Sequence, residues 1–277
     1  MNYPSLSMKY SRILCWSLAF AIGIVSVEAQ TPKPMTSPAA TQNTGSGKTP
    51  PEVEKALATP ESPEQVKALV EAAKEWAKKE PAAAVAWAFQ LPPALSAKVC
   101  SPVALVNPPV SAEFFIQQNE KGKGNLHGLI LGWTPADPTA AEAWCMKAPK
   151  SVRYLAFFTF ADALARKDRT SGPAWVEKLK AAAEEDRFAA IHGVAMIWGR
   201  GDADSVAVWM KQLKPDEMKF AAKVVISGYA YNAKLKSLGA TKDDAIKAWL
   251  KQFPFSDQEN EAILKSTAPP SYGPLQK

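Results

Sequence analysis

WTPADPTAAEAWCMKAP, residues 133–149, contains two tryptophans separated by ten residues, with an Asp-Pro pair between them and a proline at the end. Asp137 can accept hydrogen bonds from the free amides that open a helix, and the proline after it is well tolerated at the first helical position. Pro149 lies five residues after Trp144 and disfavours continuation of a helix. The stretch therefore predicts the end of one helix near Trp133, a short turn, and a second helix of about three turns.

The same pattern occurs six times along the chain. A large apolar residue is followed, after ten intervening residues, by a second large aromatic residue. The pairs are Trp76/Trp87, Val103/Phe114, Trp133/Trp144, Leu164/Trp175, Trp198/Trp209 and Leu238/Trp249. By subtraction, successive second members lie 27, 30, 31, 34 and 40 residues apart. This spacing is typical of one helix pair per repeat, the unit from which solenoid proteins are built.

Equivalent positions of the six units support this interpretation. Apolar residues recur three and seven positions before the first large residue, which places them on one helical stripe. Seven positions before the second aromatic stand Glu80, Asn107, Asp137, Asp168, Asp202 and Lys242, of which four are Asn or Asp. These residues predict helix starts. We therefore predict an all-α fold, an α-solenoid of about six helix pairs, in which the repeated aromatic residues pack in the core. A ladder of tryptophans that binds a ligand is the alternative.

The ends of the repeat region are also marked. Ser62 and Pro63 suit the start of the first helix, and Ser256 with Glu259 forms a capping box for one further C-terminal capping helix. Two of the six units match the helix-pair pattern less well. Pro102 is expected to interrupt the first helix of the second unit. The first helix of the sixth unit is long, from about Asp216 to Leu238, with a break expected near Gly228.

The pattern resembles tandem helix-pair repeats of bacterial envelope proteins, of the form W-A-x-x-D-P-x-A-A-x-A-W-x-x-x-L-P. The best matches are residues 76–92 (WAKKEPAAAVAWAFQLP) and residues 133–149, and the resemblance extends more weakly over residues 64–267. It implies an exported, curved α-solenoid related in shape to TPR and HEAT arrays, and it implies no catalytic residue. The Leu-Gly pair of the TPR consensus is absent, so TPR peptide-binding positions are not carried over.

The regions outside the repeats differ in composition. Residues 1–29 have the layout of a secretory signal peptide, with Lys9 and Arg12 before an uncharged apolar stretch and small residues that suit cleavage after Ala29. A membrane anchor is the alternative, but the apolar stretch is shorter than the usual span of about twenty residues. We predict a disordered tether rich in Pro, Thr and Ser over residues 30–62 and a disordered tail over residues 268–277. The repeat domain then covers residues 63–267.

Charge and composition limit the classes of partner. The formal net charge is +6 over 277 residues, and removal of Lys9, Arg12 and Glu28 with the signal lowers it to +5. This mild excess favours an anionic partner, either an acidic protein or an anionic envelope polymer. The positive charges are too few and too scattered to indicate a nucleic acid. We also expect no integral membrane span in the mature chain.

No constellation of residues predicts a cofactor, a metal site or a catalytic group. GSGKT at residues 45–49 matches only the end of a phosphate-binding loop, because position 42 is Gln and the prolines at 50 and 51 are expected to block the helix that should follow. His127 and His192 occupy one column two repeats apart, roughly 20 Å from each other, so they cannot share a metal ion. We expect them to form hydrogen bonds with a neighbouring helix.

Cysteines and carboxylates have ordinary structural interpretations. Cys100 and Cys145 fall in apolar columns, which favours buried free thiols over the disulfide that export would permit. Glu184, Glu185 and Asp186 are expected at a helix start, where acids favour the positive end of the helix dipole. A glycosidase-like pair of carboxylates is the alternative.

We therefore expect a non-catalytic binding or scaffold protein of the bacterial cell envelope that presents a helical-repeat surface to a protein or polymer. The alternative is an envelope hydrolase, or the helical accessory domain of a glycan- or peptide-processing enzyme. The candidate partner-binding residues are Arg153, Tyr154, Tyr229 and Tyr231, which are cationic or aromatic and lie within the predicted first helices. Ordinary packing is the alternative for each.

Overall fold

The computed structural model describes residues 48–59, 62–201, 203–229 and 242–266. These residues form fourteen α-helices and one short 3-10 helix, with no strand among them, so the predicted all-α class is confirmed. The helices are α2 (Pro51–Leu57), α3 (Pro63–Lys79), α4 (Pro81–Gln90), α5 (Pro93–Ala104), α6 (Pro108–Gln117), α7 (Glu120–Ala136), α8 (Pro138–Lys147), α9 (Lys150–Lys167), α10 (Ser171–Lys178), η2 (Leu179–Ala181), α11 (Glu184–Gly201), α12 (Ala203–Met210), α13 (Pro215–Tyr229), α15 (Lys242–Leu250) and α16 (Asp257–Ser266). None of the described helices is long and apolar enough to cross a membrane.

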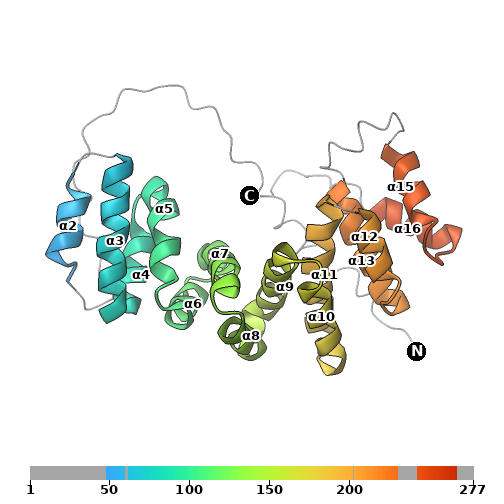
Figure 1. The fold of residues 1–277 in the computed structure, drawn as a ribbon, viewed down its shortest axis with the longest axis horizontal. Helices are drawn as coiled ribbons and strands as arrows, with labels where there is room; N and C mark the ends of the chain where they lie inside the picture. The colour runs from blue at the N-terminus through green and yellow to red at the C-terminus, as the bar shows by residue number, and fades with distance from the viewer. Residues whose placement is uncertain (1–47, 60–61, 202, 230–241, 267–277) are drawn as a thin grey trace, which may run out of the picture. The chain divides into compact units, whose positions relative to one another are not determined.

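We name the helices by their place in the predicted helix pairs. The first helices are α3, α5, α7, α9, α11 and α13, and the second helices are α4, α6, α8, α10, α12 and α15. Each first helix packs against the next first helix, from α3 to α13, and α9 and α11 share the most extensive of these contacts (Figure 1). The second helices α4, α8, α10 and α12 also pack against the first helix that precedes and the one that follows each of them. Helices that are close in the sequence are therefore close in space.

The second helices begin where the sequence predicted. The Asn107 side chain accepts a hydrogen bond from the backbone amide of Val110 at 3.4 Å, and Asp137 accepts one from Ala140 at 2.9 Å. Asp168 accepts from the amides and hydroxyls of Thr170 and Ser171, which lowers the pKa of its carboxyl well below the usual range. Prolines at the first position of α4, α6 and α8 have no amide hydrogen to leave unsatisfied. Asp202 lies outside the described residues.

The predicted starts of α3 and α16 are confirmed in the same way. The Ser62 hydroxyl accepts a hydrogen bond from the amide of Gln65 at 3.1 Å. At α16 the capping box is complete: the Ser256 amide donates to the Glu259 carboxylate at 2.8 Å, and the Glu259 amide donates to the Ser256 hydroxyl at 3.3 Å. These bonds satisfy amide groups that a helix start otherwise leaves without a partner.

The repeated aromatic residues join the two helices of a unit. The ring centroids of Trp76 and Trp87 lie 5.9 Å apart, those of Trp133 and Trp144 lie 6.1 Å apart, and those of Trp198 and Trp209 lie 5.9 Å apart. Each pair meets at an inclined angle, an arrangement that contributes roughly 0.5–1.5 kcal/mol beyond area burial. The other described members of the pattern are buried or half-buried: Val103, Phe114, Leu164, Trp175 and Trp249. Leu238 lies outside the described residues.

Two local expectations were wrong. Residues 51–57, assigned to the tether, form α2, because Pro51 is tolerated at the first helical position and Val53 is fully buried in the core shared with α3. Pro51 therefore opens a helix and does not block one. Pro102 lies within α5, which continues to Ala104. The end of α13 at Tyr229 agrees with the break expected near Gly228, and Leu238 lies outside the described residues.

Glycine permits a close helix approach between α9 and α11. A Cβ atom added at Gly193 would lie 2.3 Å from the carbonyl oxygen of Phe158 and 2.8 Å from the amide nitrogen of Asp162. No side chain fits at these distances, so glycine lets the two helix backbones come together.

Candidate binding surface on the first helices

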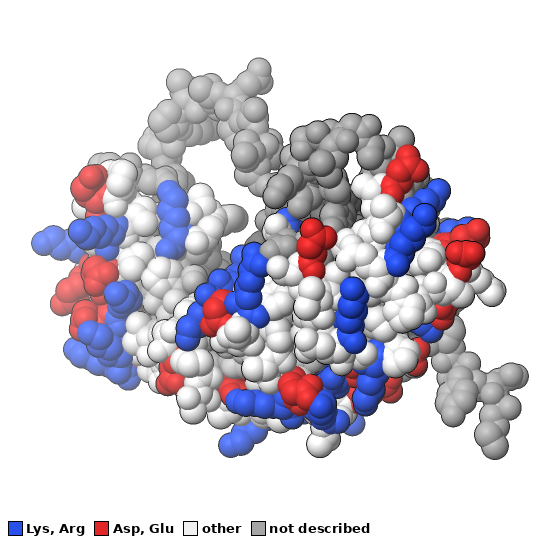
Figure 2. Space-filling model, turned by 45° about the vertical axis from the view of Figure 1, so that its right-hand side comes forward, with Lys and Arg blue, Asp and Glu red and all other residues white. Residues whose placement is uncertain are grey.

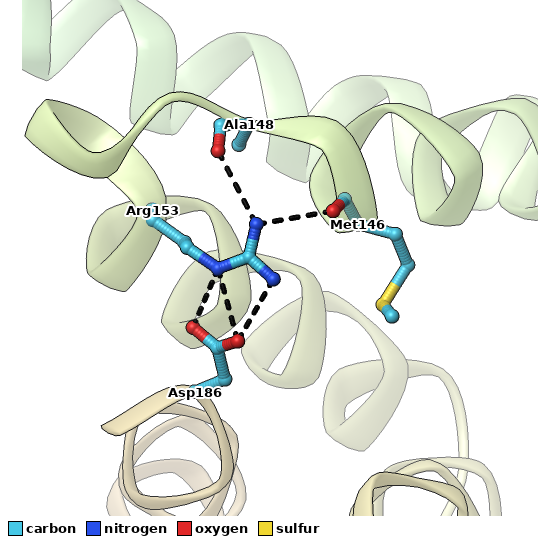
Figure 3. A network of polar contacts seen from close by, with 4 residues as sticks. All are labelled: Met146, Ala148, Arg153 and Asp186. Atoms are coloured by element: carbon cyan, nitrogen blue, oxygen red, sulfur yellow. Dashed lines mark hydrogen bonds and ion pairs between the residues drawn. The ribbon is translucent and has the colours of Figure 1, made fainter. Parts of the chain in front are cut away.

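Arg153, a candidate contact residue, is half-buried and is held by a network that joins three helices (Figure 3). Its Nε donates to both carboxylate oxygens of Asp186 at 2.8 and 2.9 Å, and its Nη2 donates to Oδ2 at 2.8 Å. Nη1 donates to the carbonyl oxygens of Met146 and Ala148 at 3.0 and 3.3 Å, at the end of α8. The bonds to Asp186 raise the pKa of Arg153 above its ordinary value. The guanidinium thus ties α8, α9 and α11 together.

Tyr154, the second candidate, is also bound to the neighbouring first helix. Its hydroxyl forms a hydrogen bond of 2.8 Å with Nδ1 of His192 on α11. His192 is only 2% exposed, and its ring lies 4.8 Å from that of Phe158 and 5.9 Å from that of Phe220. Burial lowers the pKa of His192 to about 4, so the imidazole is neutral near pH 7.

His127 has the corresponding environment on the other side of α9. Its Nδ1 forms a hydrogen bond of 2.9 Å with the Thr159 hydroxyl, and its ring stacks on Phe158 at 6.0 Å. Burial lowers the pKa of His127 as well. Both histidines therefore form hydrogen bonds with α9, as expected from their shared column.

A second arginine network joins α11 to α13. Arg187 donates through Nε and Nη2 to the two carboxylate oxygens of Glu217 at 2.6 and 3.2 Å, and its Nη1 donates to the carbonyl oxygen of Val176. Both side chains are buried. Glu217 also accepts from the Lys214 amide at 3.2 Å, at the start of α13. Removing either charge would leave its partner buried without compensation.

These links share a sequence separation close to the repeat length. The polar contacts that join an element to its counterpart in the next unit span 25 to 38 residues, as follows: Cys100–Asn125, His127–Thr159, Glu142–Trp175, Arg153–Asp186, Tyr154–His192, Ala165–Trp198, Arg169–Ser205 and Arg187–Glu217. The aromatic positions of successive units lie 27 to 40 residues apart. From the second unit onward, each unit is thus tied to the next by specific polar bonds as well as by apolar packing.

The remaining residues of interest are the other two candidate contact residues, Tyr229 and Tyr231, and the two cysteines. Tyr229 is the last residue of α13, and Tyr231 lies outside the described residues. Cys100 and Cys145 are buried free thiols, and burial raises their pKa values to about 11 and about 12. Over the described ranges, no group of three or more His, Cys, Asp or Glu residues could hold a metal ion.

Sequence reasoning missed the acidic partners of the arginines. Asp186 was interpreted as a charge at a helix start, and it does lie in the first turn of α11, but it also binds Arg153. Asp162, which was not singled out, is fully buried on α9 and binds Arg166. The 33-residue separation of Arg153 and Asp186, close to one repeat, was the available indication.

On the face shown in Figure 2, charge does not single out one large area. In Figure 2, Lys and Arg side chains are interspersed with Asp and Glu over the face in view, with broad uncharged areas between them. Searches against protein-family models, curated proteins and solved structures found no match. The candidate surface is therefore defined by geometry alone. It consists of the accessible residues of α7, α9, α11 and α13, among which Arg153 and Tyr154 are half-buried, whereas the groups that they bind, Asp186 and His192, are buried.

Proposed function

We propose that the chain is a non-catalytic binding or scaffold protein of the bacterial cell envelope, built as an α-solenoid of helix pairs. The observation that supports this most directly is the series of polar contacts at one-repeat separation, because such contacts fix the position of each unit on the next. A solenoid fixed in this way presents an extended and rigid surface, which is how repeat proteins bind partners. The partner is an acidic protein or an anionic envelope polymer.

The structural roles of the titratable groups support a binding function over a hydrolytic one. Arg153, Arg187 and their acidic partners hold helices together, and His192 is buried beneath aromatic rings. A hydrolase needs acids and bases that converge on an accessible substrate position. The groups described on α9, α11 and α13 are instead directed at one another.

Site-specific photo-crosslinking tests the proposal. A Cβ atom at Gly128 on α7 or at Gly201 at the end of α11 meets nothing within 4 Å, so a photo-reactive side chain can be attached at either position without a clash at its first carbon. Val208 on the second helix α12 is 63% exposed and serves as the matched control. Crosslinking is carried out in cells that express the full chain.

We expect a discrete adduct from Gly128 or Gly201 and none from Val208. The absence of an adduct from both first-helix positions would overturn the proposal that this surface binds a partner. Export is tested separately by mass spectrometry of the protein from the envelope fraction, which should begin at Gln30. A chain that keeps residues 1–29 and stays in the cytosol would contradict the envelope location.

A further inference from the structure

The junction between the second and the third unit is built differently from the other junctions. Among consecutive first helices from α3 to α13, α5 and α7 share the least extensive contact. Helix α6 packs against α4 and α7 but makes little contact with α5, the first helix of its own pair. The junction divides these helices into an N-terminal part, α2–α5, and a C-terminal part, α6–α13. We call the boundary between the two parts the α5–α7 seam.

The polar side-chain contact described between α5 and α7 is a weak one. Asn125 on α7 donates to the Cys100 thiol on α5 at 3.4 Å, and sulfur is a poor acceptor. Lys98 on α5 is exposed, and the contacts of exposed charges contribute only about 0–1 kcal/mol. The buried charged side chains of the described residues lie on other helices, α9, α11 and α13: Asp162, Asp186, Arg187 and Glu217. Buried ion pairs therefore join the later units but not the two sides of this seam.

Apolar surfaces make up most of the remaining contact across the seam. The ring of Phe89 on α4 lies 5.6 Å from that of Phe114 and 6.1 Å from that of Phe115, both on α6. At the end of α5, the Leu105 side chain faces Gly132 on α7, where an added Cβ atom would lie 3.0 Å from Leu105 Cδ1. Apolar contacts have no required direction, so such surfaces can slide without breaking a hydrogen bond.

The helices of the N-terminal part are well connected to one another. The Gln65 side chain on α3 donates to the carbonyl oxygen of Leu57 at the end of α2 at 3.3 Å. The rings of Trp76 and Trp87 join α3 to α4, and α5 packs against both α3 and α4. These four helices are therefore expected to move together.

On the other side of the seam, α6 is fixed to α7. A Cβ atom added at Gly122 on α7 would overlap the carbonyl oxygen of Phe115, so the two helix backbones are in direct contact. Asn119 in the turn between them has a positive φ of 51°, which is a strained conformation for this residue. The turn is nevertheless held at both of its peptide groups: the Asn119 amide donates to Ile116 and its carbonyl accepts from the Gly122 amide, each at 3.1 Å. Motion at the seam therefore has to occur before α6.

The chain passes from one part to the other through residues 105–107, between α5 and α6. Beside this connection the buried Ser111 hydroxyl donates to the carbonyl oxygen of Ala104 at 3.0 Å, which holds the start of α6 to the end of α5. Hinges are formed by a few residues at the ends of elements that absorb changes in backbone dihedral angles. A connection of three residues that is held at one point and flanked by apolar surfaces meets this description.

We propose that the α5–α7 seam is a hinge. The helices α2–α5 turn as one body about residues 105–107 relative to α6–α13, and the spacing between α5 and α7 changes. The hinge goes beyond the proposed function, and only its consequence for binding rests on that function. The surface on α7–α13 keeps its shape, while the N-terminal helices move towards or away from a partner bound beside them.

Distances between pairs of nitroxide labels, measured by pulsed electron paramagnetic resonance on the full chain, test the hinge. The labels are attached to ketone-bearing amino acids, so that both native cysteines stay unchanged. The pair Lys67/Lys167 spans the seam, whereas Lys67/Gln90 lies within the N-terminal part and Lys167/Val208 within the C-terminal part. All four positions are exposed. We expect the distance distribution of the spanning pair to be about twice as broad as those of both control pairs. Equal breadth in the three pairs would overturn the hinge.

A disulfide across the seam gives a second and independent test. Asn125→Cys places a thiol opposite Cys100, and oxidation should link α5 to α7. The Lys67/Lys167 distribution should then narrow to the breadth of the controls and widen again on reduction, with an unchanged circular dichroism spectrum. An unchanged breadth in the bridged protein would place the motion elsewhere and reject the seam as its origin. If the bridge does not form, the three label pairs in the unaltered chain still decide the question.

The hinge and the proposed function can fail separately. The label distances require no partner, so a missing crosslink from Gly128 and Gly201 would remove the binding function and leave the hinge intact. Equal breadths together with a crosslink from either position would have the opposite meaning: the chain binds a partner on a surface that does not bend at the seam.

Discussion

Acidification should destabilise the protein through His192, and the effect can be isolated with one substitution. The imidazole is enclosed by Phe158, Phe220 and the Tyr154 hydroxyl, and the charge of Arg200 disfavours a second positive charge nearby. Its pKa is about 4 in the folded protein, compared with an ordinary value of 6.5. The unfolded chain therefore takes up a proton at a higher pH than the folded protein does.

The direction and size of the effect follow from this difference. Above about pH 6.5 both states are neutral at this position and no stability is lost. As the pH falls from 6.5 towards 4, the unfolded state is stabilised by proton binding and the folded state is not. The pKa of His192 is 6.5 in the unfolded chain and about 4 in the folded protein. This difference corresponds to a loss of about 3 kcal/mol in the free energy of unfolding when the pH falls from 6.5 to 4. His127, whose pKa is also lowered, acts in the same direction.

Urea unfolding followed by far-UV circular dichroism, repeated from about pH 7 to about pH 4, measures this loss. His192→Gln cannot titrate at this position but retains a polar group beside Tyr154. Between about pH 7 and about pH 4, its free energy of unfolding should therefore decrease less than that of the wild type, by about 3 kcal/mol. Tyr154→Phe removes the hydroxyl and leaves the histidine, so it should keep the wild-type dependence. Parallel curves for the wild type and His192→Gln would refute the reasoning.

Three further predictions concern stability and reactivity. Gly193→Ala should lower the free energy of unfolding by about 1–3 kcal/mol, because its Cβ would overlap the backbone of α9, whereas Gly128→Ala should be neutral or stabilising; thermal denaturation compares the two. Either Arg187→Met or Glu217→Gln alone should lower the free energy of unfolding by about 3–5 kcal/mol, because a buried group is left without its partner. A double-mutant cycle should show strong coupling between the two positions, and additive losses would contradict the buried pair. Cys100 and Cys145 should react with a thiol reagent only slowly in the native protein and rapidly after unfolding, and a fast native reaction would show that the thiols are accessible.

The sequence predicted those features that depend on neighbouring residues. Asn107 and Asp137 cap the helices that they precede, and Pro149 follows the end of α8, because these interactions are formed within a few residues of the chain. The tryptophan pairs were predicted because both members lie within one helix pair.

Contacts between units were harder to predict from the sequence. Nothing near Arg153 indicates that its carboxylate partner is Asp186, because the pair forms only when α9 packs against α11. The same applies to the burial of Asp162, which is decided by helices on either side of α9. The helix at 51–57 was missed because the sequence around it is rich in proline, while Val53 is buried only through its contact with α3.

The contacts between α9 and α11 have a mechanical consequence. This pair is joined by the Arg153 ion pair, the Tyr154 hydrogen bond, the Trp198 hydrogen bond and the close approach at Gly193. When the two ends of the chain are pulled apart, helices at the periphery should detach before this central pair, because each has fewer neighbours to hold it. The pair of α9 and α11 would then keep its contacts while the outer helices yield to tension.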